Sequence, residues 1–199
     1  MKKINKQIIP KICVLLGTCL LLVGALLLVF WQWNINYSIQ KSETYVEILR
    51  NLIPEPQGAV LEERSDNRMP ILSVDGEDFV GVLEMPQYDS ALPVGADWGN
   101  LTKHPCRFSG NIYDSTMQIG ATSQKGQYDF YREISVYDTV VFTDMEGNRY
   151  TYTVTNLQYE SHADQTALNQ KEASLTLFIK NVYDFEYLIV SCDIANALF

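Results

Sequence analysis

The stretch Phe142–Val154 reads FTDMEGNRYTYTV, and it decides the fold class of the chain. Tyr150, Tyr152 and Val154 alternate with threonines, and a period of two is typical of a β-strand with one buried face. The segment Asp144–Asn148 (DMEGN) carries turn residues and separates this strand from the apolar run before it. The stretch therefore predicts a β-hairpin.

Other short runs rich in β-branched and aromatic residues lie on both sides of this hairpin. They are Asp78–Glu84 (DFVGVLE), Thr116–Ala121 (TMQIGA), Thr139–Thr143 (TVVFT), Ser174–Ile179 (SLTLFI) and Glu186–Ser191 (EYLIVS). Short strands at regular spacing with turn residues between them are typical of an all-β barrel or sandwich. The segment Gln127–Ile134 is predicted to add one helical turn between strands.

An apolar run near the N-terminus, Ile12–Trp31, contains no charged residue. At a rise of about 1.5 Å per residue, an α-helix of this length crosses about 30 Å of hydrocarbon. A secretory signal peptide has a shorter apolar region and a small-residue cleavage site, whereas this run continues into Trp33 and Tyr37, which favour the membrane interface. We therefore predict a transmembrane helix over residues 12–33.

The orientation follows from the charges before this helix. Lys2, Lys3, Lys6 and Lys11 precede it without any acidic residue. The positive-inside rule then makes residues 1–11 a cytoplasmic basic tail. We expect a single-pass protein of the cell membrane whose C-terminal domain is extracellular.

The outer part begins with a second helical pattern. Ser38–Ile53 has apolar residues at helical spacing and is ended by Pro54, and a charged segment, Gln57–Arg68, follows. We therefore predict a helical stalk and linker over residues 34–68 and a β-domain over residues 69–199.

The composition excludes several classes of function. The formal charge of −9 disfavours a nucleic-acid partner, because phosphates need a basic surface. Two histidines, and four cysteines without zinc-site spacing, predict no metal and no cofactor. Cys13 and Cys19 fall within the membrane span as small apolar residues. Whether the outer cysteines, Cys106 and Cys192, form a disulfide is left open by the sequence.

Six segments of the β-domain match one family in order and spacing. They are GVLEMPQYDSALPV (Gly81–Val94), PCRFSG (Pro105–Gly110), MQIGAT (Met117–Thr122), FTDMEGNRYTYTV (Phe142–Val154), SLTLFIK (Ser174–Lys180) and YLIVSC (Tyr187–Cys192). Together they resemble the sortases, the membrane-anchored cysteine transpeptidases of Gram-positive bacteria. The resemblance implies an eight-stranded sortase-like β-barrel with short helices and a groove for a sorting motif of the LPxTG type.

The resemblance also implies three catalytic positions. In the family a Cys attacks the substrate carbonyl, a His protonates the leaving amine, and an Arg stabilises the oxyanion or positions the substrate. The His position holds Thr122, the Cys position Lys180 and the Arg position Tyr187. A threonine hydroxyl exchanges no proton near neutral pH, a lysine would end in a stable amide, and tyrosine carries no positive charge. None of the catalytic residues is therefore intact.

A small shift in the alignment does not restore the missing groups. Cys192 lies inside the last strand segment, and Cys106 and His104 precede the strand that should carry the His. His162 lies far from either cysteine in sequence. A sharper hypothesis for Lys180 is that it pairs with an acid of the loop Asn181–Glu186 and fills the former groove.

These observations predict a catalytically inactive sortase-like protein, a pseudoenzyme displayed at the cell surface. Its expected role is to bind or scaffold partners, namely proteins with sorting signals, pilins or an active sortase. The alternative is a divergent sortase, a cysteine transpeptidase that anchors LPxTG-type proteins to the cell wall through unfamiliar residues. A decaying paralogue with no task is a third interpretation that the sequence does not separate from a scaffold.

Overall fold

The computed structural model describes residues 8–55, 57–58, 68–161, 173–184 and 186–195. The chain divides into two compact units, Met1–Ser38 and Ile39–Phe199.

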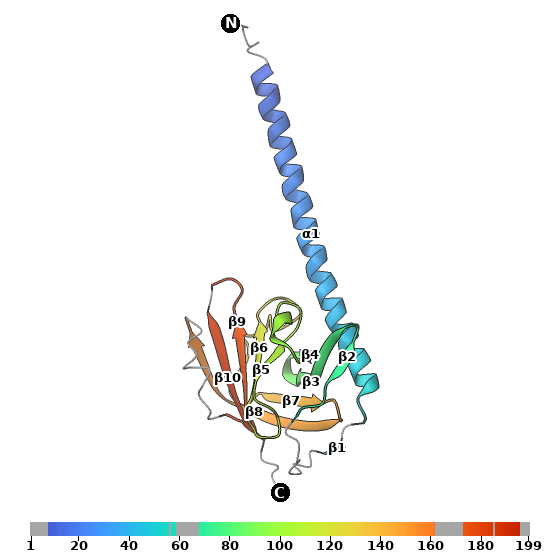
Figure 1. The fold of residues 1–199 in the computed structure, drawn as a ribbon. Coiled ribbons are helices and arrows are strands. Elements are labelled where there is room, and N and C mark those ends of the chain that lie inside the picture. Colours follow the sequence, from blue (N-terminus) through green and yellow to red (C-terminus); the bar gives the residue numbers. More distant parts are fainter. Residues whose placement is uncertain (1–7, 56, 59–67, 162–172, 185, 196–199) are drawn as a thin grey trace. The chain divides into compact units, whose positions relative to one another are not determined.

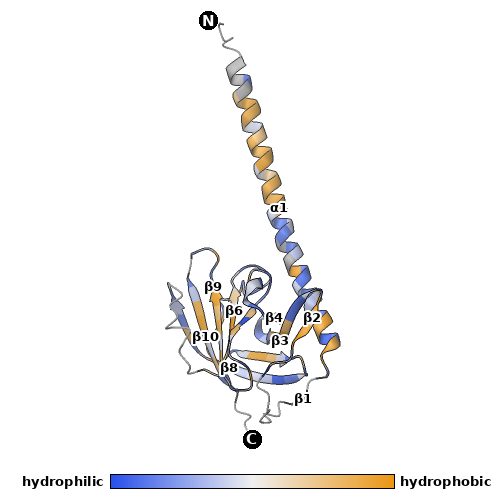
Figure 2. Cartoon of the chain, viewed as in Figure 1, coloured by the Kyte–Doolittle hydropathy of each residue, from blue (hydrophilic) through white to orange (hydrophobic). Residues whose placement is uncertain are grey.

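Helix α1 runs from Ile8 to Leu52. No proline or glycine stands between Trp31 and Ile53, so the apolar run and the second helical segment form one continuous helix rather than two. The side chains from Cys13 to Trp33 are exposed, and Figure 2 shows this stretch as strongly hydrophobic. In the described part of the chain, α1 is the one helix long and apolar enough to cross a membrane, so an N-terminal anchor is available.

The second unit consists mainly of strands, which Figure 1 labels along the chain. They are β1 (Gln57–Gly58), β2 (Leu72–Val74), β3 (Glu77–Met85), β4 (Ser90–Gly95), β5 (Cys106–Ser109), β6 (Met117–Thr122), β7 (Thr139–Asp144), β8 (Asn148–Glu160), β9 (Leu175–Lys180) and β10 (Tyr187–Ile194), with two 3-10 helices, η1 (Pro86–Tyr88) and η2 (Trp98–Asn100).

Eight of these strands close into a barrel. The order β8-β10-β9-β6-β5-β4-β3 is completed by β7, which pairs with both β3 and β8. The short strands β1 and β2 extend the sheet beside β8 and β3. The predicted eight-stranded all-β barrel is therefore confirmed. Its weakest junction is the β4–β5 seam, where a single residue pair, Gly95 opposite Cys106, joins the two strands.

The predicted hairpin is the β7–β8 pair. Asp144 is fully buried at its turn, and its Oδ1 accepts hydrogen bonds from the backbone N–H groups of Glu146 and Asn148, both at 2.9 Å. The alternating residues Tyr150 and Tyr152 point into the core, as their burial shows. The predicted helical turn at residues 127–134 is wrong, because this segment forms a succession of tight turns.

The last turns of α1 pack on the outside of the barrel. Tyr45, Val46 and Leu49 form a second apolar cluster with three residues of β2 and β3, which are Val74, Phe79 and Val82. Residues from Ile39 onward, which the sequence pattern places in the stalk, therefore share a compact unit with the barrel.

Candidate functional site

The three positions singled out by the sequence lie at neighbouring strand ends. Thr122 ends β6, Lys180 ends β9 and Tyr187 begins β10. The strand register pairs Lys180 with Thr122 on one side and with Tyr187 on the other. Alternate residues of these strands, Ala121 and Ile179, belong to the barrel core, so the three side chains lie on the outer face.

Thr122 is enclosed by the turn that follows it. Its side chain is buried, and its Oγ1 has no hydrogen-bond partner. Its backbone N–H donates to Gln127 Oε1 at 3.0 Å, and its carbonyl accepts from the N–H of Tyr128 at 3.2 Å. The residue therefore has the burial of a structural strand end, with one unsatisfied hydroxyl.

The loop after β9 is tied to the same turn. Ser123 N–H donates to the carbonyl of Lys180 at 2.9 Å, and Ser123 Oγ accepts from Val182 N–H at 3.2 Å. The buried Asn181 side chain accepts from Ser123 Oγ at 3.3 Å. Of the loop acids, Asp184 lies 3.6 Å from Arg132, which gives that carboxylate a cation other than Lys180.

Trp98 of η2 covers the outer face next to these positions. Its ring lies 5.5 Å from that of Phe178 and 4.9 Å from that of Phe108, measured between centroids. A Cβ on Gly120 would stand 2.3 Å from the Trp98 ring, so only glycine lets the indole lie this close to β6. The side chain of Gln127 donates to Leu101 O at 3.1 Å and holds the η2 loop against the turn after β6.

This arrangement holds few groups that could perform proton transfer or nucleophilic attack at neutral pH. Its side chains supply a hydroxyl, a primary amine and a phenol, in place of the thiol, imidazole and guanidinium that the resemblance implies. The covering by Trp98 and Gln127 also leaves the outer face of β6 partly occupied by the chain itself.

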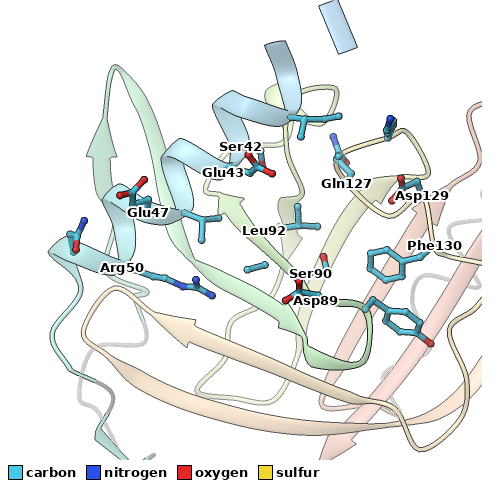
Figure 3. Close-up of a pocket in the computed structure, with 17 residues that line it drawn as sticks. Ser42, Glu43, Glu47, Arg50, Asp89, Ser90, Leu92, Gln127, Asp129 and Phe130 are labelled. Atoms are coloured by element: carbon cyan, nitrogen blue, oxygen red, sulfur yellow. The ribbon is translucent and has the colours of Figure 1, made fainter. Parts of the chain in front are cut away.

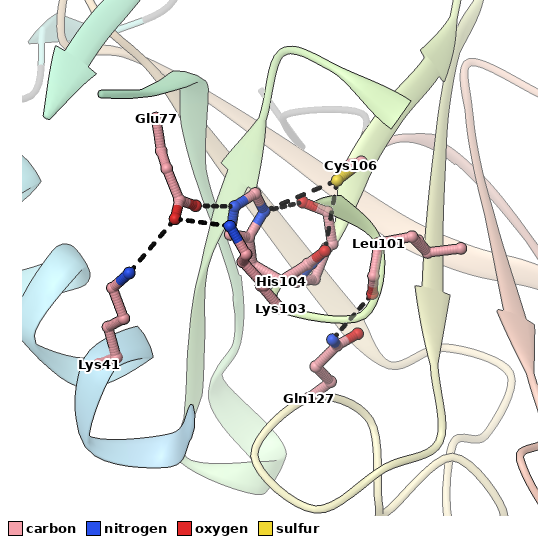
Figure 4. Close-up of polar contacts among 8 residues, drawn as sticks. Lys41, Glu77, Leu101, Lys103, His104, Cys106 and Gln127 are labelled. Atoms are coloured by element: carbon pink, nitrogen blue, oxygen red, sulfur yellow. Dashed lines mark hydrogen bonds and ion pairs between the residues drawn. The ribbon is translucent and has the colours of Figure 1, made fainter. Parts of the chain in front are cut away.

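A thiol and an imidazole do meet elsewhere, at the β4–β5 seam (Figure 4). Cys106 Sγ lies 3.6 Å from Nδ1 of His104, and Nε2 of His104 lies 2.9 Å from Oε2 of Glu77. The other oxygen of Glu77 lies 3.3 Å from Lys41 Nζ and 3.0 Å from Lys103 Nζ. We call these five residues the seam cluster.

The seam cluster follows from local structure. Asp75 and Gly76, both with positive φ, form the two-residue turn that brings Glu77 to the start of β3. Gly95 leaves room for the imidazole, since a Cβ there would stand 2.5 Å from Cε1 of His104. The pair His104 and Cys106 is visible in the sequence two residues apart, whereas Glu77 is 27 residues from His104 and gives no sequence signal.

The order thiol, imidazole, carboxylate resembles a nucleophilic triad, but the thiol is not poised to react. Cys106 is 0% exposed and His104 is 2% exposed. Burial raises the pKa of the Cys106 thiol to about 12, so the thiolate is scarce at neutral pH. Cys106 and Cys192 are both free and buried, so the disulfide that the sequence left open is not formed. His162 lies outside the described residues.

Glu77 is the electrostatic centre of the seam cluster. Burial by itself would raise the pKa of its carboxyl, but hydrogen bonds from His104, Lys103 and Lys41 outweigh that effect and lower the pKa to about 2. Both ring nitrogens of His104 face oxygens, Glu77 Oε2 at 2.9 Å and Pro105 O at 3.1 Å, so an imidazolium can donate to both. The seam cluster therefore fits a structural role, tying the end of α1 to the barrel junction. The described residues contain no group of three or more metal-ligating side chains.

Comparison with solved structures identifies the architecture. The chain matches sortase C1 of GBS pilus island 1 with 15% identity and a TM-score of 0.54, over 82% of this chain and 84% of that one. It matches sortase C-1 from Actinomyces oris with 16% identity and a TM-score of 0.52, over 79% of this chain and 98% of that one. For sortase A from Corynebacterium diphtheriae the identity is 14%, the TM-score 0.51, and the coverage 81% and 84%.

These similarities show that the chain has the sortase fold, as the sequence resemblance predicts. No protein-family model matches the sequence, and no curated protein matches it significantly. At such low identities the likeness concerns the backbone, and the chemistry of the site depends on the residues that occupy it.

Proposed function

We propose that this chain is a membrane-anchored sortase-like protein that has no transpeptidase activity and that binds or scaffolds surface proteins. The observation that carries the proposal is the set of neighbours at the strand ends: Thr122, Lys180 and Tyr187 occupy the outer-face positions where the family resemblance calls for His, Cys and Arg. Catalytic residues of this kind act as a unit, so the loss of all three leaves little activity to rescue.

The anchor and its orientation belong to the same proposal. Residues 12–33 cross the membrane, the lysine-rich residues 1–11 stay in the cytoplasm, and the barrel faces outward. The membrane anchor is supported by the apolar, exposed side chains of α1, and the orientation by the lysines that precede them. An extracellular barrel would meet substrates and enzymes of cell-wall sorting.

The partners we propose are proteins that carry sorting signals, pilins, or an active sortase. One solved structure with this fold is the sortase C1 of a pilus island, which makes a pilin a reasonable member of that set. A fold of this kind without a nucleophile could hold a partner without cleaving it.

A cleavage assay tests the part of the proposal that concerns transpeptidase activity. The full-length chain, purified in a neutral detergent, is incubated with a fluorescent peptide of the LPxTG type and monitored for release of the C-terminal fragment. We expect no cleavage with or without reducing agent. Cleavage by the wild-type chain that requires a free thiol and disappears in the Cys106→Ser variant would contradict the proposal.

The alternative of a divergent sortase rests on the contact between Cys106 and His104. It requires that the Cys106 thiol reach the substrate, although it is 0% exposed. Mass spectrometry after incubation with the sorting peptide distinguishes the two functions. A covalent adduct on Cys106 supports the divergent enzyme, and an unmodified chain supports the binding protein.

A thiol-labelling experiment provides a second, substrate-free measurement. In a variant with Cys13→Ala and Cys19→Ala, we expect Cys106 and Cys192 to react with an aromatic disulfide reagent only after denaturation. Rapid labelling of one thiol in the folded chain would favour the enzyme.

A further inference from the structure

A pocket of about 620 Å³ lies between the last turns of α1 and the outside of the barrel (Figure 3). One wall is the helix from Ile39 to Asn51, and the other is formed by β4, by η1 and by the turn around Gln127. Neither Thr122 nor Lys180 nor Tyr187 lines it. The volume is that of a site for a small ligand or for a few side chains of a larger one.

The rim of the pocket is acidic. Four exposed carboxylates lie around it, those of Glu43, Glu47, Asp89 and Asp129. Within the described parts of the chain, none of the four takes part in an ion pair. Of the two cations on the pocket wall, Arg50 lies 2.5 Å from Glu84, which neutralises it, and Lys125 remains. The pocket therefore offers an excess of negative charge.

Apolar and aromatic side chains form part of the pocket wall. Val46 and Leu92 are buried, and Phe130 stacks on Tyr88 with ring centroids 4.5 Å apart and an interplanar angle of 16°. The Tyr88 hydroxyl donates to the Asp138 carboxylate and so fixes the orientation of that ring. Aromatic faces beside carboxylates are the surroundings that organic cations prefer.

Ser42 adds an unmet hydrogen bond on the same wall. It lines the pocket opposite Leu92 and Gln127, and its side chain is 6% exposed. Its Oγ is one of four buried side-chain polar atoms without a hydrogen-bond partner among the described residues, and an unpaired buried hydroxyl costs free energy. A bound donor would remove that cost.

We propose that this pocket binds a primary alkylammonium group, with the apolar stem against Val46, Leu92 and Phe130 and the charged head toward the acidic rim. Both a lysine side chain of a protein segment and a free polyamine have this chemistry. The site is separate from the strand ends discussed above, so it does not depend on whether the barrel is a pseudoenzyme.

Calorimetric titration of the full-length chain, in neutral detergent at physiological ionic strength, tests the proposal. The probes are spermidine, the capped tripeptide Leu-Lys-Leu, and the capped tripeptide Leu-Gln-Leu as neutral control. We expect saturable binding of at least one amine and none of the neutral peptide. Tighter binding of the lysine peptide identifies a protein segment as the source, and tighter binding of spermidine identifies a free polyamine.

Matched variants separate this site from general attraction to an acidic protein. Asp129→Asn should weaken binding by about two- to fivefold, the range of an exposed ion pair. Asp75→Asn, the same change at an exposed turn outside the pocket, should leave the affinity unchanged. Ser42→Ala should weaken binding while leaving the fold intact. Equal effects of Asp129→Asn and Asp75→Asn, or no binding of either amine, would overturn the proposal.

Discussion

Two regions of the barrel divide between them what an active site needs. At the ends of β6, β9 and β10, Thr122, Lys180 and Tyr187 are neighbours on one outer face, but none is a thiol, an imidazole or a guanidinium. At the β4–β5 seam, Cys106, His104 and Glu77 form a thiol–imidazole–carboxylate series within hydrogen-bonding reach, but the series is buried. The first region holds the positions that the family resemblance implies, without the catalytic side chains, and the second holds a thiol, an imidazole and a carboxylate that a substrate does not reach.

The difference lies in what surrounds the groups. A nucleophilic cysteine needs a lowered pKa and an open path for the substrate. In the seam cluster, burial raises the pKa of Cys106 to about 12, and Nε2 of His104 is held 2.9 Å from Glu77, which also binds two lysines. Residue types that can catalyse at an accessible strand end therefore have a structural role when they are buried in the barrel wall.

The largest expected effect on stability comes from a substitution in the seam cluster. Glu77→Gln removes the carboxylate that serves Lys41, Lys103 and His104, and leaves the buried imidazole of His104 without its charged acceptor. Breaking a buried ion pair by removing one partner costs about 3–5 kcal/mol of the free energy of unfolding. Denaturant unfolding of the full chain measures it.

A matched control is Glu84→Gln, because Glu84 pairs with two exposed arginines, Arg50 and Arg149. Its loss should cost less than about 1 kcal/mol. Equal destabilisation by the two variants would mean that the seam cluster is no more than a surface ion pair.

The pH dependence of stability sharpens the same comparison. Because the pKa of Glu77 is lowered from 4.5 to about 2 in the folded chain, its ionised form stabilises the fold above pH 4.5, and this contribution is lost as the pH falls from there toward about 2. The lost contribution is about 3 kcal/mol. The free energy of unfolding of wild type and Glu77→Gln should therefore converge over this window, and parallel profiles would argue against a lowered Glu77 pKa.

A moderate effect is expected at the strand-end face. Gly120→Ala places a methyl group 2.3 Å from the Trp98 ring and 2.7 Å from Phe178, so the indole must leave β6. Overpacking of this kind costs about 1–3 kcal/mol. In a Trp98→Ala background, Gly120→Ala should cost less, because the indole ring that the new methyl group would meet is absent. A double-mutant cycle, measured by unfolding in urea, gives the coupling energy between the two positions. Additive effects would show that Trp98 does not rest on Gly120.

The elements of the barrel were predictable where a local pattern decides them. The alternation in Tyr150–Val154 predicted both the strand and its buried face. Two helices were expected in the N-terminal part, but the absence of Gly and Pro after Trp31 lets α1 continue to Leu52. The helical turn predicted for Gln127–Ile134 is wrong, because the apolar residues of this segment belong to a series of turns that pack on the core.

The two regions differ in how much of each could be predicted from the sequence. Thr122, Lys180 and Tyr187 were found through a family resemblance, since they stand at strand ends whose order is fixed by topology. The seam cluster depends on Glu77. A hairpin turn and the pairing of β4 with β5 at a single residue pair bring Glu77 close to His104. Neither of these two features leaves a pattern in the sequence. Burial of the cluster, which decides its chemistry, is likewise a property of the closed barrel.

The smallest expected effect has the opposite sign and concerns Thr122. Its Oγ1 is buried without a partner, so Thr122→Val keeps the shape of the side chain and removes an unsatisfied hydroxyl. We expect the free energy of unfolding to rise by roughly 0.5–1 kcal/mol. The control is Thr116→Val, where the hydroxyl accepts from Asn111 N–H at 3.3 Å and donates to Asp114, and where stability should fall. A loss of stability in Thr122→Val would mean that the Thr122 hydroxyl does have a hydrogen-bond partner. Because no neighbouring side chain or backbone group among the described residues provides one, that partner would be a bound polar molecule at the strand-end site.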